Sequence, residues 1–86
     1  MKLVTTKAEA GRYIVSAVHN GVIRFFEVCK EYNEDGDGGK RWSIYETILT
    51  TKVRCDWGGW GWSSKAKAVG FIKRVLKLQN LLAAQG

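Results

Sequence analysis

The chain has 86 residues, which is enough for one small domain but not for two domains with separate cores. Hydrophobic residues make up 45% of the chain, aromatic residues make up 12%, and proline is absent; this composition excludes a disordered chain. The 14 basic and 8 acidic residues give a net charge of +6, which favours anionic partners such as nucleic acid, an acidic protein or anionic lipid. A charge of this size is also ordinary for the surface of a small domain.

Cysteine and histidine are too few for a metal centre. The chain has two cysteines, Cys29 and Cys55, and one histidine, His19, whereas a structural zinc site takes about four ligands at defined spacing. No apolar run follows the first residues, and no stretch approaches the ~20 apolar residues that span a bilayer. We therefore expect a cytoplasmic protein with reduced thiols, no metal, no cofactor and no membrane segment; a Cys29–Cys55 disulfide is the alternative.

The first residues of the chain leave two interpretations open. Leu3 and Val4 are apolar and can begin an edge strand. The segment Thr6–Gly11 is instead compatible with a single helical turn that ends at its glycine.

The first clear element is a β-hairpin. Two β-rich runs, Tyr13–Val18 and Val22–Tyr32, flank Asn20-Gly21, and Asn-Gly is the strongest short signal for a two-residue type I′ turn. One face of this hairpin is predicted to face the core, with Arg24 as its only charge; it collects Tyr13, Val15, Ala17, Phe26 and Val28. The other face is more apolar than a solvent-facing surface requires, and carries Ile14, Ser16, Val18, Ile23, Phe25 and Glu27. Either another segment covers this second face, or it is a partner or dimer surface.

A polar, glycine-rich loop and a long third strand follow. Residues 33–39 resemble the opening of a calcium loop, but the twelfth position, where that loop needs a glutamate, is Ile44. We therefore interpret the loop as a connection between strands. Lys40–Val53 is predicted as a strand that bends near Thr50, and the alternation of Val53, Cys55 and Trp57 predicts a short fourth strand.

A Trp/Gly segment, residues 57–62, joins the sheet to the helix. Its glycines permit a sharp turn, and its three tryptophans supply large rigid surfaces. In one interpretation Trp57 and Trp62 fill the core and only Trp60 is exposed. In the other, the tryptophans form an aromatic platform that stacks on a base or anchors a protein interface.

The last third of the chain predicts one amphipathic helix. Ser63 or Ser64 is a suitable N-cap, and the helix is expected from Lys65 to about Ala83. Half of its circumference is apolar and comprises Ala68, Val69, Phe71, Ile72, Val75, Leu76, Leu78 and Leu82. The opposite face is basic and comprises Lys73, Arg74 and Lys77, with Lys67 at its border and with Gly70 and Leu81 within it. This face is either a solvated surface or a binding surface.

No pattern in the chain indicates an enzyme. His19 lies beside the hairpin turn, where we expect it to be exposed, and the acidic residues cluster only in the glycine-rich loop. The helix start is the remaining candidate site. Backbone amides at a helix N-terminus attract anions, and Lys65 and Lys67 follow the two serines directly.

The segment Gly59-x-Gly61-x-Ser63-Ser64-Lys65-Ala66-Lys67 resembles the glycine-rich strand end and basic helix start of the double-stranded RNA-binding domain. The resemblance covers about the last third of the chain. It implies Lys65 as a phosphate contact and Lys67 more loosely. Ser64 stands where the family has its first lysine, and the family's N-terminal helix has no counterpart in this sequence.

The sequence predicts one α+β domain over residues 1–86, with a three- or four-stranded antiparallel β-meander packed by one C-terminal α-helix. The first functional hypothesis is a nucleic-acid-binding module for RNA or DNA, with phosphate contacts from Lys65, Lys67, Lys73, Arg74 and Lys77 and a stacking surface at Trp60. The second is a protein-binding accessory or inhibitor, of the kind that a phage or mobile element encodes, whose interface uses Ile23, Phe25, Trp60 and Leu81. Either one is compatible with a monomer or a homodimer.

Overall fold

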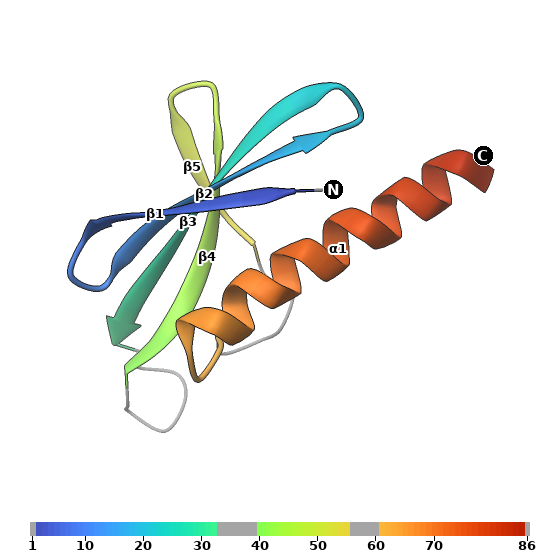
Figure 1. Cartoon of the computed structure of the whole chain (residues 1–86). Coiled ribbons are helices and arrows are strands. Elements are labelled where there is room, and N and C mark those ends of the chain that lie inside the picture. Colours follow the sequence, from blue (N-terminus) through green and yellow to red (C-terminus); the bar gives the residue numbers. More distant parts are fainter. Residues whose placement is uncertain (1, 33–39, 56–60, 86) are drawn as a thin grey trace.

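The computed structural model describes residues 2–32, 40–55 and 61–85, and all statements about the structure concern these residues. A five-stranded antiparallel sheet is followed by one helix that lies across one of its faces, which confirms the predicted α+β fold (Figure 1). The strands follow one another in the sheet in chain order. The elements are β1 (Leu3–Glu9), β2 (Arg12–His19), β3 (Val22–Tyr32), β4 (Lys40–Ile48), β5 (Thr51–Arg54) and α1 (Lys65–Gln85).

The β2–β3 hairpin forms as the sequence predicts. Asn20 and Gly21 have φ angles of 52° and 77°, the left-handed conformation that a type I′ turn requires at both central positions. This turn fixes the register, so that Val15 pairs with Phe26 and Tyr13 with Val28. The predicted core face of the hairpin is therefore confirmed.

The N-terminal segment is an edge strand, so the helical turn considered for Thr6–Gly11 is wrong. β1 pairs antiparallel with β2 from Leu3↔Ala17 to Glu9↔Arg12. It therefore lies beside β2 and does not cover the outer face of the sheet, the face that α1 leaves open. The sheet has five strands where three or four were predicted.

The predicted bend near Thr50 is a tight turn between two strands. β4 ends at Ile48 and β5 begins at Thr51, with the pair Ile48↔Thr51 closing the turn. Leu49 has a φ of 58° and is 95% exposed. Leucine rarely adopts this conformation, so the sequence predicted a bend here but not a turn with a positive φ at Leu49.

A backbone bridge attaches the start of α1 to the sheet. Trp42 and Trp62 exchange two backbone hydrogen bonds of 2.8 and 2.9 Å. Gly61 makes this approach possible: its φ is 96°, and a Cβ atom there would lie 2.9 Å from the carbonyl oxygen of Trp42. Ser64 is then the N-cap, because its Oγ accepts a 3.2 Å hydrogen bond from the amide of Lys67.

The core lies between α1 and the helix-facing side of the sheet. Ala68, Ile72 and Leu76 recur every four residues on one side of α1 and are fully buried. They pack on the buried sheet residues Val15, Ala17, Phe26, Val28 and Ile44. Trp62 closes one end of this core, with its ring 5.2 Å from the ring of Phe71, in agreement with the prediction that it fills the core.

The last turns of α1 extend past the sheet, as Figure 1 shows at the C-terminal end of the chain. Leu78 and Leu82, predicted on the apolar side of the helix, are therefore 55% and 59% exposed, and Leu81 is 61% exposed. Helical periodicity identifies the side of a helix but not where along its length the covering sheet ends. The buried side of α1 reaches only to Leu76 and the half-buried Asn80.

Two leucines of α1 provide a matched test of this packing. Leu76→Ala removes a fully buried side chain, and we expect it to lower the free energy of unfolding by about 3 kcal/mol because a cavity remains. Leu78→Ala removes the same atoms from an exposed position and should change stability by no more than about 0.5 kcal/mol. Urea unfolding of both variants measures the two values, and equal losses would contradict the packing.

Candidate anion-binding face on the C-terminal helix

All charged side chains of α1 are basic. The helix carries Lys65, Lys67, Lys73, Arg74 and Lys77 and no aspartate or glutamate. The first turn has no acidic residue and the last turn has no basic residue. This arrangement is opposite to the one that the helix dipole favours, because cations near a helix N-terminus are destabilising. The stability of the helix therefore does not account for the position of these charges.

The carboxylates of the described residues all lie on the sheet, and all have partners there. Glu46 binds Arg24 through two hydrogen bonds of 2.7 Å. Glu27 accepts hydrogen bonds from Arg12 at 2.8 Å and makes an ion pair with Lys52 at 2.7 Å. The remaining two follow the same pattern, with Glu9 bound to Arg12 and Glu31 bound to the hydroxyl of Tyr45.

Four cations of α1 consequently have no carboxylate partner among the described residues. They are Lys67, Lys73, Arg74 and Lys77, and all four are exposed. Lys65 differs from them because it is half-buried, with its Nζ atom 4.4 Å from the centre of the Tyr13 ring. The structure thus places Lys65 against the sheet and leaves the other four predicted contacts facing solvent. We call these four residues the basic face of α1.

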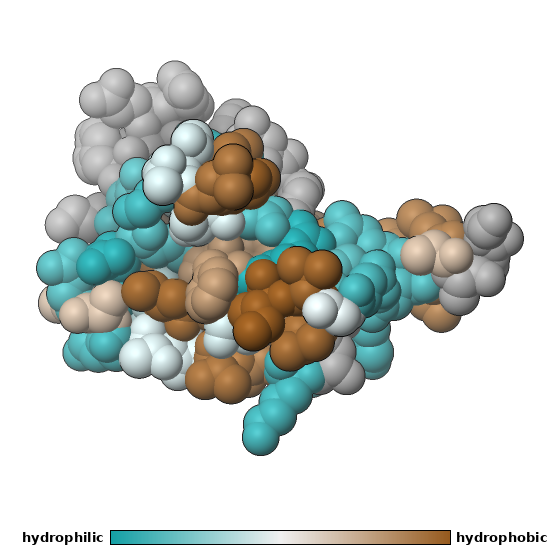
Figure 2. Space-filling model, turned by 90° about the horizontal axis from the view of Figure 1, so that it is seen from above, coloured by the Kyte–Doolittle hydropathy of each residue, from teal (hydrophilic) through white to brown (hydrophobic). Residues whose placement is uncertain are grey.

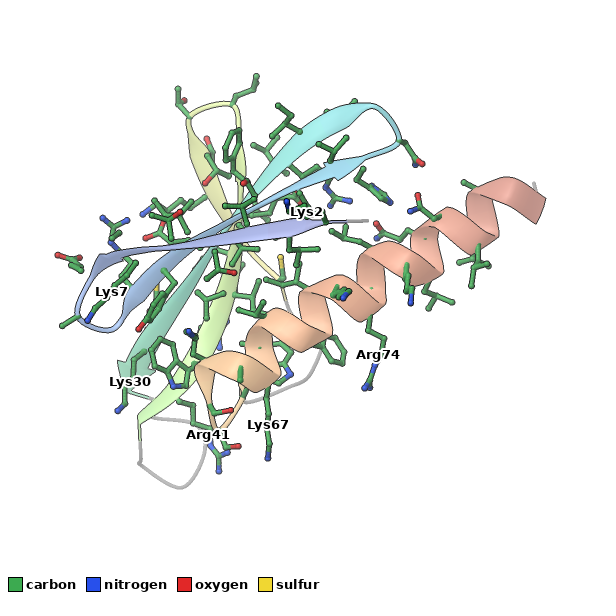
Figure 3. All side chains as sticks on the ribbon, viewed as in Figure 1. Lys2, Lys7, Lys30, Arg41, Lys67 and Arg74 are labelled. Carbon is green, nitrogen blue, oxygen red and sulfur yellow. The ribbon has the colours of Figure 1, made fainter. Side chains whose placement is uncertain are left out.

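The basic face forms two rows with a glycine between them. At about 100° per residue, Lys67 and Arg74 lie on one side of Gly70, while Lys73 and Lys77 lie on the other. Figure 3 shows that Lys67 and Arg74 point away from the sheet in the same direction. Their positions are seven residues apart, or about 10 Å along a helix. The spacing suits repeated contacts along an extended anion.

Two shallow depressions flank Gly70 and share it. One, of about 230 Å³, is lined by Gly70, Lys73, Arg74 and Lys77. The other, of about 290 Å³, is lined by Trp62, Lys67, Gly70, Phe71 and Arg74. The sequence indicated the position of Gly70 on the basic face, but not the two depressions beside it.

The helix start is less open to an anion than the sequence suggested. Ser64 Oγ already accepts from the amide of Lys67, and Lys65 lies over the ring of Tyr13. The exposed cations therefore begin at Lys67 and continue along the helix. Trp60, predicted as a stacking surface next to these charges, lies outside the described residues.

The outer face of the sheet contains a buried carboxylate that the sequence did not predict. Glu27 was assigned to an open face, yet it is only 4% exposed. Burial alone would raise the pKa of Glu27, but hydrogen bonds from Lys52 and Arg12 outweigh it and hold this pKa below the ordinary carboxyl value. Glu27 is therefore an ionised partner of Arg12 and Lys52.

Two further groups of this face are unsuited to nucleophilic chemistry. Burial, together with the charge of Glu27, raises the pKa of the Cys29 thiol to about 11. Burial and a hydrogen bond to Glu31 raise the pKa of Tyr45 to about 12. A thiol with such a pKa is protonated at neutral pH and is a poor nucleophile. Neither Cys29 nor Cys55 is in a disulfide, so the Cys29–Cys55 disulfide considered for them is wrong.

The other end of the outer face is apolar and exposed. Val18 and Ile23 are both 59% exposed, and Phe25 is 48% exposed. Val4, Val18 and Ile23 line a depression of about 130 Å³, and Phe25 lies on the same face of the sheet. Figure 2, seen from the side of the hairpin turns, shows apolar side chains gathered over this end of the sheet. We call Val4, Val18, Ile23 and Phe25 the apolar sheet patch; Leu81 lies on α1 and is not part of it.

His19 is buried, which corrects the prediction that it is exposed. It is 8% accessible and lies on the helix-facing side of the sheet. Arg24 can only donate hydrogen bonds, so its Nη1 donates to Nδ1 of His19 at 3.1 Å. The hairpin turn is exposed, but the alternation of β2 directs this side chain inward.

No group of three or more histidine, cysteine, aspartate or glutamate side chains among the described residues could hold a metal ion. Within the same residues, no helix is both long and apolar enough to cross a membrane.

Comparison with known proteins finds no matching family model, no significantly similar curated protein and no significantly similar solved structure. The geometry of the surface is therefore the basis for a functional proposal.

The lowered pKa of Glu27 predicts an acid-sensitive contribution to stability. Because the folded-state pKa lies below the ordinary value of 4.5, the ionised carboxylate adds stability above that value, and this contribution disappears as the pH falls through the lowered pKa. Urea unfolding between about pH 3 and pH 7 should show a weaker pH dependence for Glu27→Gln than for the natural sequence. Glu9→Gln, which removes a carboxylate with a 66% exposed side chain that also pairs with Arg12, is the comparison and should change the profile much less than Glu27→Gln.

Proposed function

We propose that the protein binds nucleic acid through the phosphates, using the basic face of α1. One observation carries this proposal: Lys67, Lys73, Arg74 and Lys77 are exposed on a helix without acidic residues, and the described carboxylates are all bound to other groups on the sheet. An external anion is the partner that this face lacks. Nucleic-acid backbones present phosphates at a regular spacing, and lysine and arginine are the side chains that usually contact them.

The composition of the basic face favours phosphates over an acidic protein. Cores of protein interfaces are rich in aromatic and apolar residues and depleted in lysine. Between Lys67 and Lys77 the outward positions of α1 are basic, apart from Gly70. Contacts of this kind position a duplex or single strand without reading its bases, so we expect binding that tolerates changes of sequence.

The apolar sheet patch supports a second candidate function, which is protein binding. An exposed group of large apolar side chains around a depression is typical of an interaction surface. The patch lies on the opposite face of the sheet from α1. The two functions therefore use separate residues and can be tested separately.

Charge reversal on α1 tests the first function. The double variant Lys73→Glu/Lys77→Glu should bind short mixed-sequence RNA and DNA at least about tenfold more weakly, since two phosphate contacts are lost and two repulsive charges are added. The slope of log K against log salt concentration should also fall by about 2 for duplex DNA. Fluorescence polarisation at several salt concentrations measures both quantities.

The matched control reverses two exposed lysines on the sheet. Lys7→Glu/Lys30→Glu changes the net charge by the same amount at positions away from the basic face, as Figure 3 shows for both residues. It should cause a much smaller loss of affinity. Equal losses in the two double variants would contradict a site on α1. If Phe25→Ala removes binding to a protein partner and the charge reversals do not, the second function is supported instead.

A further inference from the structure

Gly70 lies in the middle of α1, where the described residues give no packing reason for a glycine. A Cβ atom at this position would have no other atom within 4 Å apart from its own helix and chain neighbours. Glycine is also among the least favourable residues in a helix interior. Gly61 is different, because there a Cβ atom would lie 2.9 Å from the Trp42 carbonyl oxygen. The absent side chain at Gly70 is thus available to a molecule that approaches from outside.

The cations of the basic face surround this position. On a helix surface the neighbours of a residue are those three and four positions away. For Gly70 they include Lys67, Lys73 and Arg74, and Lys77 is one further turn along. Both depressions on this side of α1 include Gly70 and Arg74. An anion placed over the glycine would therefore lie between two rows of positive charge.

We propose that one phosphodiester backbone lies along α1 over Gly70, between the row of Lys67 and Arg74 and the row of Lys73 and Lys77. This inference rests on the proposed function and specifies how the nucleic acid is seated. Without a side chain at residue 70, a phosphate approaches the helix backbone closely, and cations from both rows contact its oxygens. A methyl group at residue 70 holds the phosphate away from the helix and lengthens these contacts.

The variant Gly70→Ala distinguishes a phosphodiester backbone that lies over residue 70 from a general electrostatic attraction to the helix. Alanine is the better helix former and meets no atom of the folded protein, so the variant should unfold at a higher temperature than the natural sequence. Its affinity for short mixed-sequence RNA or DNA should nevertheless fall, on the order of fivefold, without a change of net charge or of the salt slope. Gly70→Gln, with a longer side chain, should weaken binding further.

The control places the same bulk elsewhere on the helix. Ala83→Gln adds a longer side chain at an exposed position beyond both rows, and it should leave the affinity unchanged. Fluorescence polarisation and thermal unfolding of the three variants provide the measurements. Suppose that Gly70→Ala and Gly70→Gln bind nucleic acid as tightly as the natural sequence while Lys73→Glu/Lys77→Glu binds more weakly. The proposed position of the phosphodiester backbone over Gly70 is then wrong, and the proposed function stands. If the natural sequence binds no nucleic acid, both proposals are wrong.

Discussion

The ion pair between Arg24 and Glu46 holds the guanidinium that hydrogen-bonds to α1. Both side chains lie on the helix-facing side, where they are only 20% and 16% exposed, and they bind through two 2.7 Å hydrogen bonds. The third nitrogen of the guanidinium, Nη1, donates to His19 and to Gln79 of α1, at 3.1 and 3.0 Å. Removing one member of such a pair leaves a nearly buried charge uncompensated, at a cost of roughly 3 kcal/mol. Through Gln79, Arg24 adds a directional polar contact to the apolar packing of α1 on the sheet.

The orientation of α1 follows from this contact and from the core. With Gln79 held at Arg24 and with Ala68, Ile72 and Leu76 buried, the opposite side of the helix faces solvent. That side contains the basic face. The arginines and lysine that pair with carboxylates, Arg12, Arg24 and Lys52, are on the sheet. The described carboxylates are thus bound on the sheet, and the four cations of the basic face have no carboxylate partner among the described residues, which is the feature on which the proposed function depends.

Much of the fold was predictable because local signals agreed with one another. Asn20-Gly21 determined a turn, a register and a core face at once. The start of α1 and the apolar side that contains its three fully buried positions followed from an N-cap and a 3.6-residue period; the helix ends at Gln85, two residues past the predicted end. The bend near Thr50 was predicted, but the positive φ at Leu49 was not, because leucine carries no signal for it; the choice between strand and helical turn for β1 was also left open.

The sequence predicted which residues of α1 form the candidate site, but not which of them are exposed or what the surrounding side chains contact. The sequence identified the cations of α1, and the structure distinguishes Lys65, which lies over Tyr13, from the four that face solvent. Burial of Glu27 depends on residues distant in sequence, such as Lys52, that strand pairing brings beside it. The exposure of Leu78 and Leu82 depends on where the sheet ends beneath the helix. None of these features has a local signal.

Amide chemical-shift mapping by nuclear magnetic resonance is the most direct test of the central claim, that the basic face of α1 is the binding surface. A labelled sample would be titrated with a short mixed-sequence nucleic acid near physiological salt. We expect the largest shift changes between Lys67 and Lys77, with the apolar sheet patch unaffected. Shift changes centred on Ile23 and Phe25, with α1 unchanged, would contradict it.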